Sequence, residues 1–564
     1  MLSSLRQRMW AALLLLILVF VNRRDCAQFN IQPGIPHRIV IQSNKTSSIY
    51  IQDVPSNIIF AVIQLHTQRN NLSISTEPKF DFGTTKTGTN VGLATMLVQG
   101  QTQFLWYVKA IAAYNLTAVA YIQLYTEYDP VPGGCNQVFS LAIDPSIVVT
   151  ANSHTTNVWF QWSNLASASV ESFPDCENIT VANTLSYDVY VSFVQQRDFS
   201  EDSYLSSIED MLSPDSIIDN GVNVFSVEDS PTAQSFVTVT SEENQGALYA
   251  VVVTRSDTKR QAAYVTAVTY ACDIENNGCS SDSSILEIIF ATVACCCGLF
   301  LLLLGHSFLK CMLFLFGLIY TSLLAYILLS LSNSLDDSLR LPIAMALGLV
   351  GGCIWLTYWY FCAFPIISVL VPGMCAGYMI AAVLFFTPFG NFWWWDTSLN
   401  YAIAFVCAVL IFTVMLMVYQ KVLSIISCGI VGAFIFLMCM AIPLRSSLRL
   451  IFLNALYHQT KDGYVTAKVV APFHLQDIIL SALWPVLIIA GVTFQFYRSR
   501  NQASFEIPAR HLTVQPQVPH RYIQDENDDD ERASLLPRYA VEGISIPDSY
   551  QTIPSSNNRR SSTD

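Results

Sequence analysis

Seven apolar stretches, each long enough to cross a membrane as a helix, follow one another between residues 285 and 496. A helix needs about 20 apolar residues to cross the roughly 30 Å hydrocarbon layer of a bilayer. Lipid offers the backbone no hydrogen-bond partners, so only helices or closed barrels persist there. The expected spans are 285–304, 309–331, 341–361, 366–386, 400–418, 422–443 and 476–496. The sequence therefore predicts an all-α, seven-helix transmembrane bundle.

The residues before the bundle carry the marks of a secreted segment. All four N-x-S/T sequons precede the first span, and they lie at Asn44, Asn71, Asn115 and Asn178. Residues 1–27 are typical of a signal peptide, because two arginines precede a short apolar core. Arg23 and Arg24 follow that core, so an uncleaved anchor remains an alternative. We expect glycans on an extracellular or lumenal region.

The net charge of −13 disfavours nucleic acid as a partner, because nucleic-acid binding needs a basic surface. Only 13% of the residues are charged, against about 25% in a typical soluble protein. The low share of charged residues reflects the predicted bundle. We therefore expect membrane lipids to be partners of this protein.

An even set of cysteines lies in the expected oxidising compartment: Cys135, Cys176, Cys272 and Cys279. Four cysteines allow three pairings. We favour Cys135 with Cys176 and Cys272 with Cys279, solely because these partners are close in sequence.

The ectodomain, residues 28–284, is predicted to be β-rich and sandwich-like. In LSYDVYVSFV, Tyr187, Val189, Val191 and Phe193 share one face of a strand. Residues 201–212 are predicted to form an amphipathic helix with Ser200 as its cap. The stretch DPVPGGC at 129–135 breaks regular structure. It either joins two lobes, 28–130 and 136–284, or is a loop within one large domain.

Seven crossings from an extracytoplasmic amino end place the tail in the cytosol. Lys310, Lys421 and Arg498 then lie inside, in accord with the positive-inside rule. One loop conflicts with that rule, since the outer residues 444–476 include Arg445, Arg449, Lys461 and Lys468. Either LRSSLRLIFLNAL within this loop is an amphipathic helix lying on the membrane surface, or one span is wrong.

Small residues recur at a spacing of four in two of the spans, at Ala344, Gly348 and Gly352 and at Gly373 and Gly377. Such residues let neighbouring helices approach closely. We interpret them as packing residues, with a substrate groove as the alternative.

The spans hold almost no ionisable groups, which are costly in lipid and mark transport pathways. Glu287 and Asp477 each lie near the start of a span. This pattern disfavours a proton-coupled transporter or a voltage sensor, whereas a transporter or channel for an uncharged solute remains an alternative. The spans also lack the D-R-Y and N-P-x-x-Y motifs of G-protein-coupled receptors. An orphan seven-span receptor is therefore the second alternative.

No motif in the sequence indicates an enzyme. G-x-S-x-G, H-E-x-x-H and a glycine-rich phosphate loop are absent. We therefore predict no enzymatic activity, no cofactor and no catalytic, cofactor-binding or metal-binding residues.

The tail, residues 497–564, is polar, rich in proline and serine, and predicted to be disordered. ERASLL fits an acidic dileucine sorting signal through Glu531, Leu535 and Leu536. YQTI fits a tyrosine-based signal through Tyr550 and Ile553. Such signals bind clathrin adaptors through an apolar pocket and a basic patch. The alternative is incidental hydrophobic residues in a linker.

Several stretches resemble the seven-transmembrane superfamily member 3 family. They are YTEYDPVPGGCN at 125–136, AIDP at 142–145, TYAC at 269–272, GHSF at 305–308, FFTPFGN at 385–391 and VTFQFYRSR at 492–500. The PVPGGCN match is fairly specific, and the others are individually weak. The bundle is also similar to the group that includes transmembrane protein 198. The tail beyond Arg500 departs most from the family.

The resemblance implies a membrane protein without known enzymatic activity or cofactor, linked to cell survival and to restraint of protein-folding stress. It defines no catalytic or ligand residues. Together with the residues themselves, it predicts a non-enzymatic glycoprotein of the plasma membrane and of endosomes or lysosomes. Its ectodomain would bind an unknown protein or lipid ligand, and its tail would bind clathrin adaptors.

Overall fold

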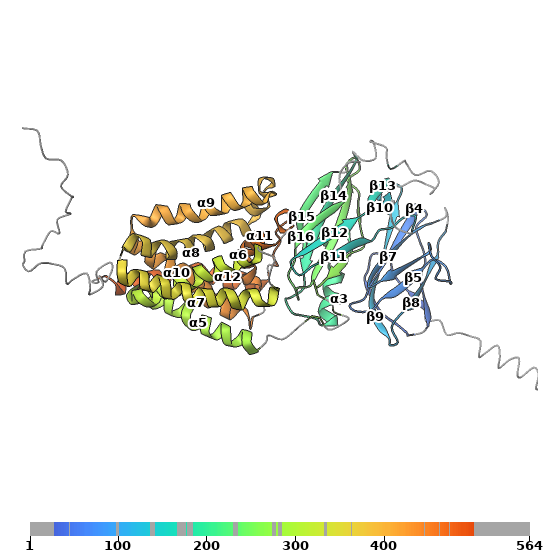
Figure 1. The fold of residues 1–564 in the computed structure, drawn as a ribbon. Helices are drawn as coiled ribbons and strands as arrows, with labels where there is room; N and C mark the ends of the chain where they lie inside the picture. The colour runs from blue at the N-terminus through green and yellow to red at the C-terminus, as the bar shows by residue number, and fades with distance from the viewer. Residues whose placement is uncertain are drawn as a thin grey trace, which may run out of the picture. The chain divides into compact units, whose positions relative to one another are not determined.

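The computed structural model describes most of the chain between residues 28 and 500. The described residues are 28–43, 45–97, 101–135, 141–165, 176, 184–228, 235–272, 274, 278–279, 285–331, 336–362, 364–444, 446–461, 463–472 and 474–500. The predicted signal peptide and tail lie outside them. Figure 1 shows the two β-rich domains, in blue to green, and the helical bundle, in yellow-green to red.

The first domain, which ends near residue 126, is a sandwich of two sheets. One sheet has the order β1 (Gln28–Asn30), β3 (Thr46–Ile51), β8 (Phe104–Ala110), β5 (Leu72–Ser75), β6 (Thr85–Gly88). The other has the order β2 (His37–Ile41), β9 (Leu116–Thr126), β4 (Ile58–His66), β7 (Asn90–Met96). Side chains such as Ile63, Trp106 and Ile122 fill the space between the sheets and are fully buried. The predicted β-rich sandwich is confirmed here.

The second domain is also built of small sheets. They are β10 (Pro130–Cys135) with β13 (Trp162–Leu165); β11 (Ile147–Ala151), β12 (Thr155–Phe160) and β16 (Phe236–Thr240); and β15 (Val222–Glu228), β14 (Leu185–Phe193), β17 (Ala247–Arg255), β18 (Gln261–Ala263) and β19 (Ala267–Thr269). As predicted, Tyr187, Val189 and Val191 of β14 face one core, and Phe193 packs against it. The stretch DPVPGGC is a strand rather than a loop, with a register shift around Gly133 at φ +67°.

The predicted helix in this domain is α3 (Glu201–Glu209), and Ser200 caps it by accepting a hydrogen bond from Ser203 N. A second short helix, α4 (Pro214–Asn220), follows and was not predicted. Its capping box joins Ser213 and Ser216. This box places serine where the common pattern has Glu or Gln.

The two β-rich domains pack against each other through shared clusters of buried side chains. Phe60 and Val62 of β4 point away from the first core and pack with the second domain. Val119 and Tyr121 of β9 likewise pack against α3 and its neighbours. β4 is buried on both faces, so its sequence IIFAVIQLH lacks the alternation of a half-exposed strand.

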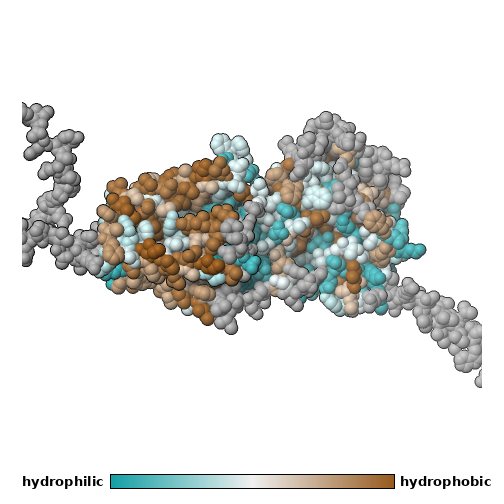
Figure 2. All heavy atoms as spheres, in the orientation of Figure 1, coloured by the Kyte–Doolittle hydropathy of each residue, from teal (hydrophilic) through white to brown (hydrophobic). Residues whose placement is uncertain are grey.

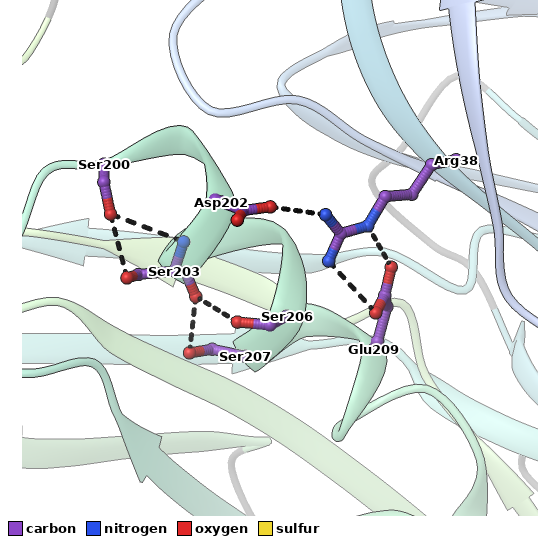
Figure 3. A network of polar contacts seen from close by, with 7 residues as sticks. All are labelled: Arg38, Ser200, Asp202, Ser203, Ser206, Ser207 and Glu209. Atoms are coloured by element: carbon purple, nitrogen blue, oxygen red, sulfur yellow. Dashed lines mark hydrogen bonds and ion pairs between the residues drawn. The ribbon is translucent and has the colours of Figure 1, made fainter.

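Polar contacts at the edge of this shared core join Arg38 of β2 to α3 (Figure 3). Arg38 donates to Asp202 at 2.5 Å and to Glu209 at 2.6 Å. Asp202 is 87% exposed, so water screens its pair with Arg38. Lys86 also bonds the fully buried Asp144 at 2.5 Å. The apolar core therefore holds the two domains together, and the exposed pairs add little.

The bundle has a helix at each predicted span. The helices are α5 (Ile285–Leu304), α6 (Leu309–Leu331), α7 (Asp337–Cys362), α8 (Pro365–Phe386), α9 (Ser398–Met417), α10 (Gln420–Ala441) and α12 (Leu475–Arg498). Among them, α8 and α10 are the most buried. Figure 2 shows hydrophobic residues over the visible face of the bundle. An apolar outer surface of this kind is what a lipid-facing bundle presents.

Six helical segments in the described part of the chain are long and apolar enough to cross a membrane, and the first runs 44 residues, Ile288–Leu331. At about 1.5 Å per residue it is twice as long as one crossing requires. A short 3₁₀ turn, η2 (Gly305–Phe308), interrupts it.

The chain reverses at η2. On α5, Gly298 lies against Phe436 and Gly305 against Cys428, so α5 runs antiparallel to α10. On α6, Met312 contacts Ser424 near the start of α10. The helix α6 also contacts the helix Leu450–Thr460, which follows the end of α10. The long segment is therefore two crossings, α5 and α6, as the sequence predicts.

The small residues do bring helices together. A Cβ on Gly352 would meet the carbonyl oxygen of Phe314 in α6 at 2.8 Å. One on Gly377 would meet the carbonyl oxygen of Val409 in α9 at 2.6 Å. A further close contact on α5, between Gly298 and Gly432 of α10, was not predicted. Its two glycines lie in different spans, so no spacing within one span indicates it.

Candidate functional site at the junction of the ectodomain and the bundle

The loop between α10 and α12 is the part of the chain that touches both the bundle and the second domain. It contains η5 (Ser447–Arg449), α11 (Leu450–Thr460) and η6 (Tyr464–Thr466). Asp477, in the first turn of α12, is 5% exposed and ties the ends of the loop together. Its carboxylate accepts from Ser446 Oγ and Ser447 N, each at 2.6 Å, and from His474 N at 3.1 Å.

The inner side of the loop packs on the bundle. Leu448 and Ala455 belong to the bundle's apolar core. The ring of His458 stacks on Tyr401 of α9, with centroids 4.1 Å apart. Burial lowers the pKa of His458 to about 3, so its ring is neutral at physiological pH.

The outer side of the loop extends a sheet of the second domain. Residues 468–470 lie along β16, and Lys468 pairs in parallel with Val239. Lys468 N donates to Thr238 O at 2.8 Å, and Thr240 N donates to Lys468 O at 3.0 Å. Val470 N donates to Thr240 Oγ1 at 3.1 Å, and the side chain of Val470 packs on the domain's core. The second domain is thus completed by residues from within the bundle's sequence.

A buried ion pair reinforces this contact. Arg449 pairs with Glu242, which is 9% exposed and also accepts from Gln196 Nε2 at 3.2 Å. Burial raises the pKa of Glu242, and the positive charge of Arg449 partly opposes this shift. The rings of His154 and Tyr457 meet beside the pair at 4.2 Å.

The turn between α8 and α9 forms the third part of the junction. It contains η3 (Pro388–Asn391) and η4 (Trp393–Trp395). Asn391 accepts from Val469 N at 2.7 Å and donates to Val469 O at 3.0 Å. Lys468 Nζ lies 3.5 Å from Asp396. A continuous set of contacts therefore runs from β16 through residues 468–470 to two membrane-spanning helices.

These contacts correct the prediction that LRSSLRLIFLNAL lies on the membrane surface. Every residue from 446 to 461 is buried or half-buried, because the helix is covered by the bundle on one side and the second domain on the other. Two basic residues of the loop have acidic partners. Arg449 pairs with Glu242, and Lys468 pairs with Asp396. The acidic partners hold these two basic side chains at the junction. Arg445 lies outside the described residues.

Some predicted sites are placed by the structure. The disulfides Cys135–Cys176 and Cys272–Cys279 are confirmed. Asn71 and Asn115 are exposed at one end of the first domain, where glycosylation remains a prediction. The other predicted site residues, which lie outside the described part of the chain, are Asn44, Asn178, Glu531, Leu535, Leu536, Tyr550 and Ile553.

Sequence reasoning missed a polar cluster at the opposite end of the bundle. Gln495 of α12 donates to Leu301 O at 2.9 Å and to Leu302 O at 2.8 Å. Its Oε1 accepts from His306 N at 3.1 Å. These bonds satisfy backbone groups that α5 leaves free where it ends. A lone glutamine in an apolar stretch was the signal that could have indicated it.

The described residues bring no three His, Cys, Asp or Glu side chains together as metal ligands. The β-rich ectodomain meets the bundle through strand pairing, an ion pair and the two hydrogen bonds of Asn391. The fold defines a multi-pass membrane protein with a β-rich ectodomain of two domains.

Comparison with known families agrees along most of the chain. Residues 27–125 match the model of the TM7SF3-like, N-terminal immunoglobulin-like domain, and residues 130–275 match that of the second immunoglobulin-like domain. Residues 291–496 match the TM7S3/TM198-like domain. Transmembrane 7 superfamily member 3 of Homo sapiens is 30% identical over 460 residues, covering 81% of this chain and 80% of the relative. That of Mus musculus is 29% identical over 510 residues, covering 88% and 90%. The chain belongs to the transmembrane 7 superfamily member 3 family.

Proposed function

We propose that this protein is a non-enzymatic membrane glycoprotein whose ectodomain binds a protein or lipid ligand and passes that event to the bundle. The supporting observation is the strand pairing of residues 468–470 with β16. Strand addition at a sheet edge is a directional contact that uses backbone hydrogen bonds. A shift of the second domain would therefore move the outer loop and, through Asn391, the turn between α8 and α9.

The cellular role we propose is the support of cell survival during protein-folding stress, as the family resemblance suggests. The test compares cells that lack the protein with cells that re-express the wild type or the variant Thr240→Val with Asn391→Leu. Both changes remove junction hydrogen bonds and leave the ectodomain core intact. Re-expression of the wild type should restore survival under a calcium-depletion stress, and the variant should not. Equal rescue by the variant would show that the junction is unnecessary, and no rescue by the wild type would overturn the survival role.

We further propose that the protein reaches the plasma membrane and the endosome or lysosome through clathrin adaptors that bind its tail. The experiment is localisation of a tail-tagged chain with glycosidase digestion, beside Leu535→Ala with Leu536→Ala. We expect glycans, a cytosolic tail and a shift of the variant from endolysosomes to the cell surface. A variant that does not move would show that the two leucines are incidental.

A further inference from the structure

The turn between α8 and α9 displays a group of large aromatic side chains. Phe389 is 46% exposed, Phe392 49%, Trp393 68% and Trp394 55%. An aromatic ring left in water loses the stabilisation that burial gives, so a dense group of them marks a contact surface. We call residues 389–394 the aromatic turn.

The aromatic turn is held in a fixed conformation by its own contacts. Trp395 Nε1 donates to Phe389 O at 3.0 Å, and the Trp395 ring packs against Phe385 at 5.8 Å. Asn400 Nδ2 donates to Trp394 O at 3.1 Å. Because Trp395 faces the protein, Trp393 and Trp394 are left pointing outward as a rigid pair.

The position of the aromatic turn indicates the surroundings of its exposed rings. It links the ends of two membrane-spanning helices on the side of the ectodomain, and lipid-facing residues of α9 follow at once: Leu399 is 69% exposed and Ile403 55%. Figure 2 shows the hydrophobic surface of the bundle to which α9 belongs. Tryptophan prefers the headgroup level of a bilayer, where its ring meets apolar chains and its N–H meets water.

We propose that the aromatic turn is a lipid anchor that couples the ectodomain-side leaflet to the junction. Trp393 and Trp394 lie among the phospholipid headgroups, and Asn391 in the same turn binds both backbone groups of Val469. Val469 lies between Lys468 and Val470, which pair with β16. The lipid surface therefore fixes the strand to which the second domain is attached. This inference is independent of any ectodomain ligand.

The first experiment measures the depth of the tryptophans in the full chain, reconstituted in phosphatidylcholine nanodiscs. Lipids brominated near the headgroup or deep in the acyl chain quench tryptophan according to its depth. The fluorescence lost in Trp393→Phe with Trp394→Phe reports these two rings alone. We expect that component to be quenched about twofold more by the shallow bromine than by the deep bromine. Trp359→Phe is the control, since the Trp359 ring is buried in the bundle's core, and the fluorescence lost in this variant should be quenched only weakly by either bromine.

The second experiment measures amide exchange at Val469 and Thr240 in the same nanodiscs. Trp393→Ser with Trp394→Ser should speed exchange about tenfold at both amides, equivalent to about one hydrogen bond's contribution. Trp359→Phe, which lies in the bundle's core and outside the turn, should leave both rates near those of the wild type. A tryptophan component that neither bromine quenches would overturn the anchor and point to a protein partner or a second copy. Shallow quenching with unchanged exchange would overturn the coupling.

Discussion

At the scale of single residues, Arg449 is the side chain on which the junction depends most. Glu242 is 9% exposed and its carboxylate cannot be solvated if its cation is removed. Loss of one partner of a buried pair costs several kcal/mol, and the partial exposure of Arg449 reduces this. We expect Arg449→Met to weaken the junction by about 2 kcal/mol. Amide exchange at residues 238–240 and 468–470 in nanodiscs should then rise about thirtyfold.

The control for this prediction removes the buried charge as well. Glu242→Gln combined with Arg449→Met leaves a neutral amide in place of the carboxylate, so most of the protection should return. If Arg449→Met alone exchanges like the wild type, the ion pair does not contribute to docking.

His66, at the contact between the two immunoglobulin-like domains, makes the ectodomain sensitive to pH. Its ring is fully buried, with Nδ1 2.9 Å from Asn90 Oδ1. Burial lowers the pKa of His66 to about 4, against about 6.5 in the unfolded chain. Between these values the unfolded chain binds a proton that the folded chain does not. Stability is therefore full above about pH 6.5 and falls as the pH drops towards 4, by about 2 kcal/mol at pH 5.

Amide exchange of β4 and β7 at pH 7 and pH 5, corrected for intrinsic rates, tests this effect. His66→Gln should reduce the difference in exchange rate between pH 7 and pH 5, because glutamine does not titrate. His37→Gln, at the start of β2, serves as the matched control and should keep the wild-type difference. An equal pH response in His66→Gln and wild type would assign the sensitivity to another group.

At the scale of elements, the sequence predicted what depends on composition and period. All spans were predicted to within a few residues, because a run of about twenty apolar residues in lipid forms a membrane-spanning helix. Elements that depend on distant partners were misread. The strand β10 contains two prolines and two glycines, and only pairing with β13 makes it a strand. The helix α11 was predicted to lie on the membrane surface because the residue that covers its outer side, His154, lies about 300 residues earlier in the sequence.

Several of the stretches that resemble the family make contacts with distant parts of the chain, and four of them contact one another in two pairs. PVPGGC meets AIDP, where a Cβ on Gly133 would lie 1.7 Å from Asp144 O. GHSF meets VTFQF through His306 and Gln495. FFTPFGN supplies Asn391 to the junction. These short matches thus mark three contacts between distant parts of the chain.

The two disulfides should differ in their effect on stability because their loops differ in length. Cys135–Cys176 spans 41 residues and Cys272–Cys279 spans 7. On the chain-entropy account, the longer loop stabilises by about 4 kcal/mol and the shorter by about 2.5 kcal/mol. Cys135→Ala with Cys176→Ala should therefore lower the midpoint of ectodomain unfolding more than Cys272→Ala with Cys279→Ala. Denaturant titration of the reconstituted chain, read by amide exchange in β14 and β17, measures both. The reverse order would mean that strain or residual structure dominates.

At the scale of the whole molecule, apolar side chains pack across two boundaries: the one between the two immunoglobulin-like domains and the one between the second domain and the loop that follows α10. Phe60 and Val62 join the first domain to the second, and Val470 joins the bundle's loop to the second domain. This packing could not be predicted from the sequence, because a residue buried between domains has the same apolar character as any other core residue. The proposed coupling between ectodomain and bundle would act through this packing and through the pairing of residues 468–470 with β16.

The same continuity predicts that the two immunoglobulin-like domains unfold together. Phe60 is fully buried, stacks on Tyr125 at 4.7 Å and packs into the core of the second domain. Phe60→Ala should cost about 3–5 kcal/mol and increase amide exchange in both domains. Arg38→Met should change stability by less than about 1 kcal/mol, because its pairs are exposed to solvent. Increased exchange confined to the first domain in Phe60→Ala would show that the shared core does not couple the domains, and a large effect of Arg38→Met would place the coupling in the ion pairs instead.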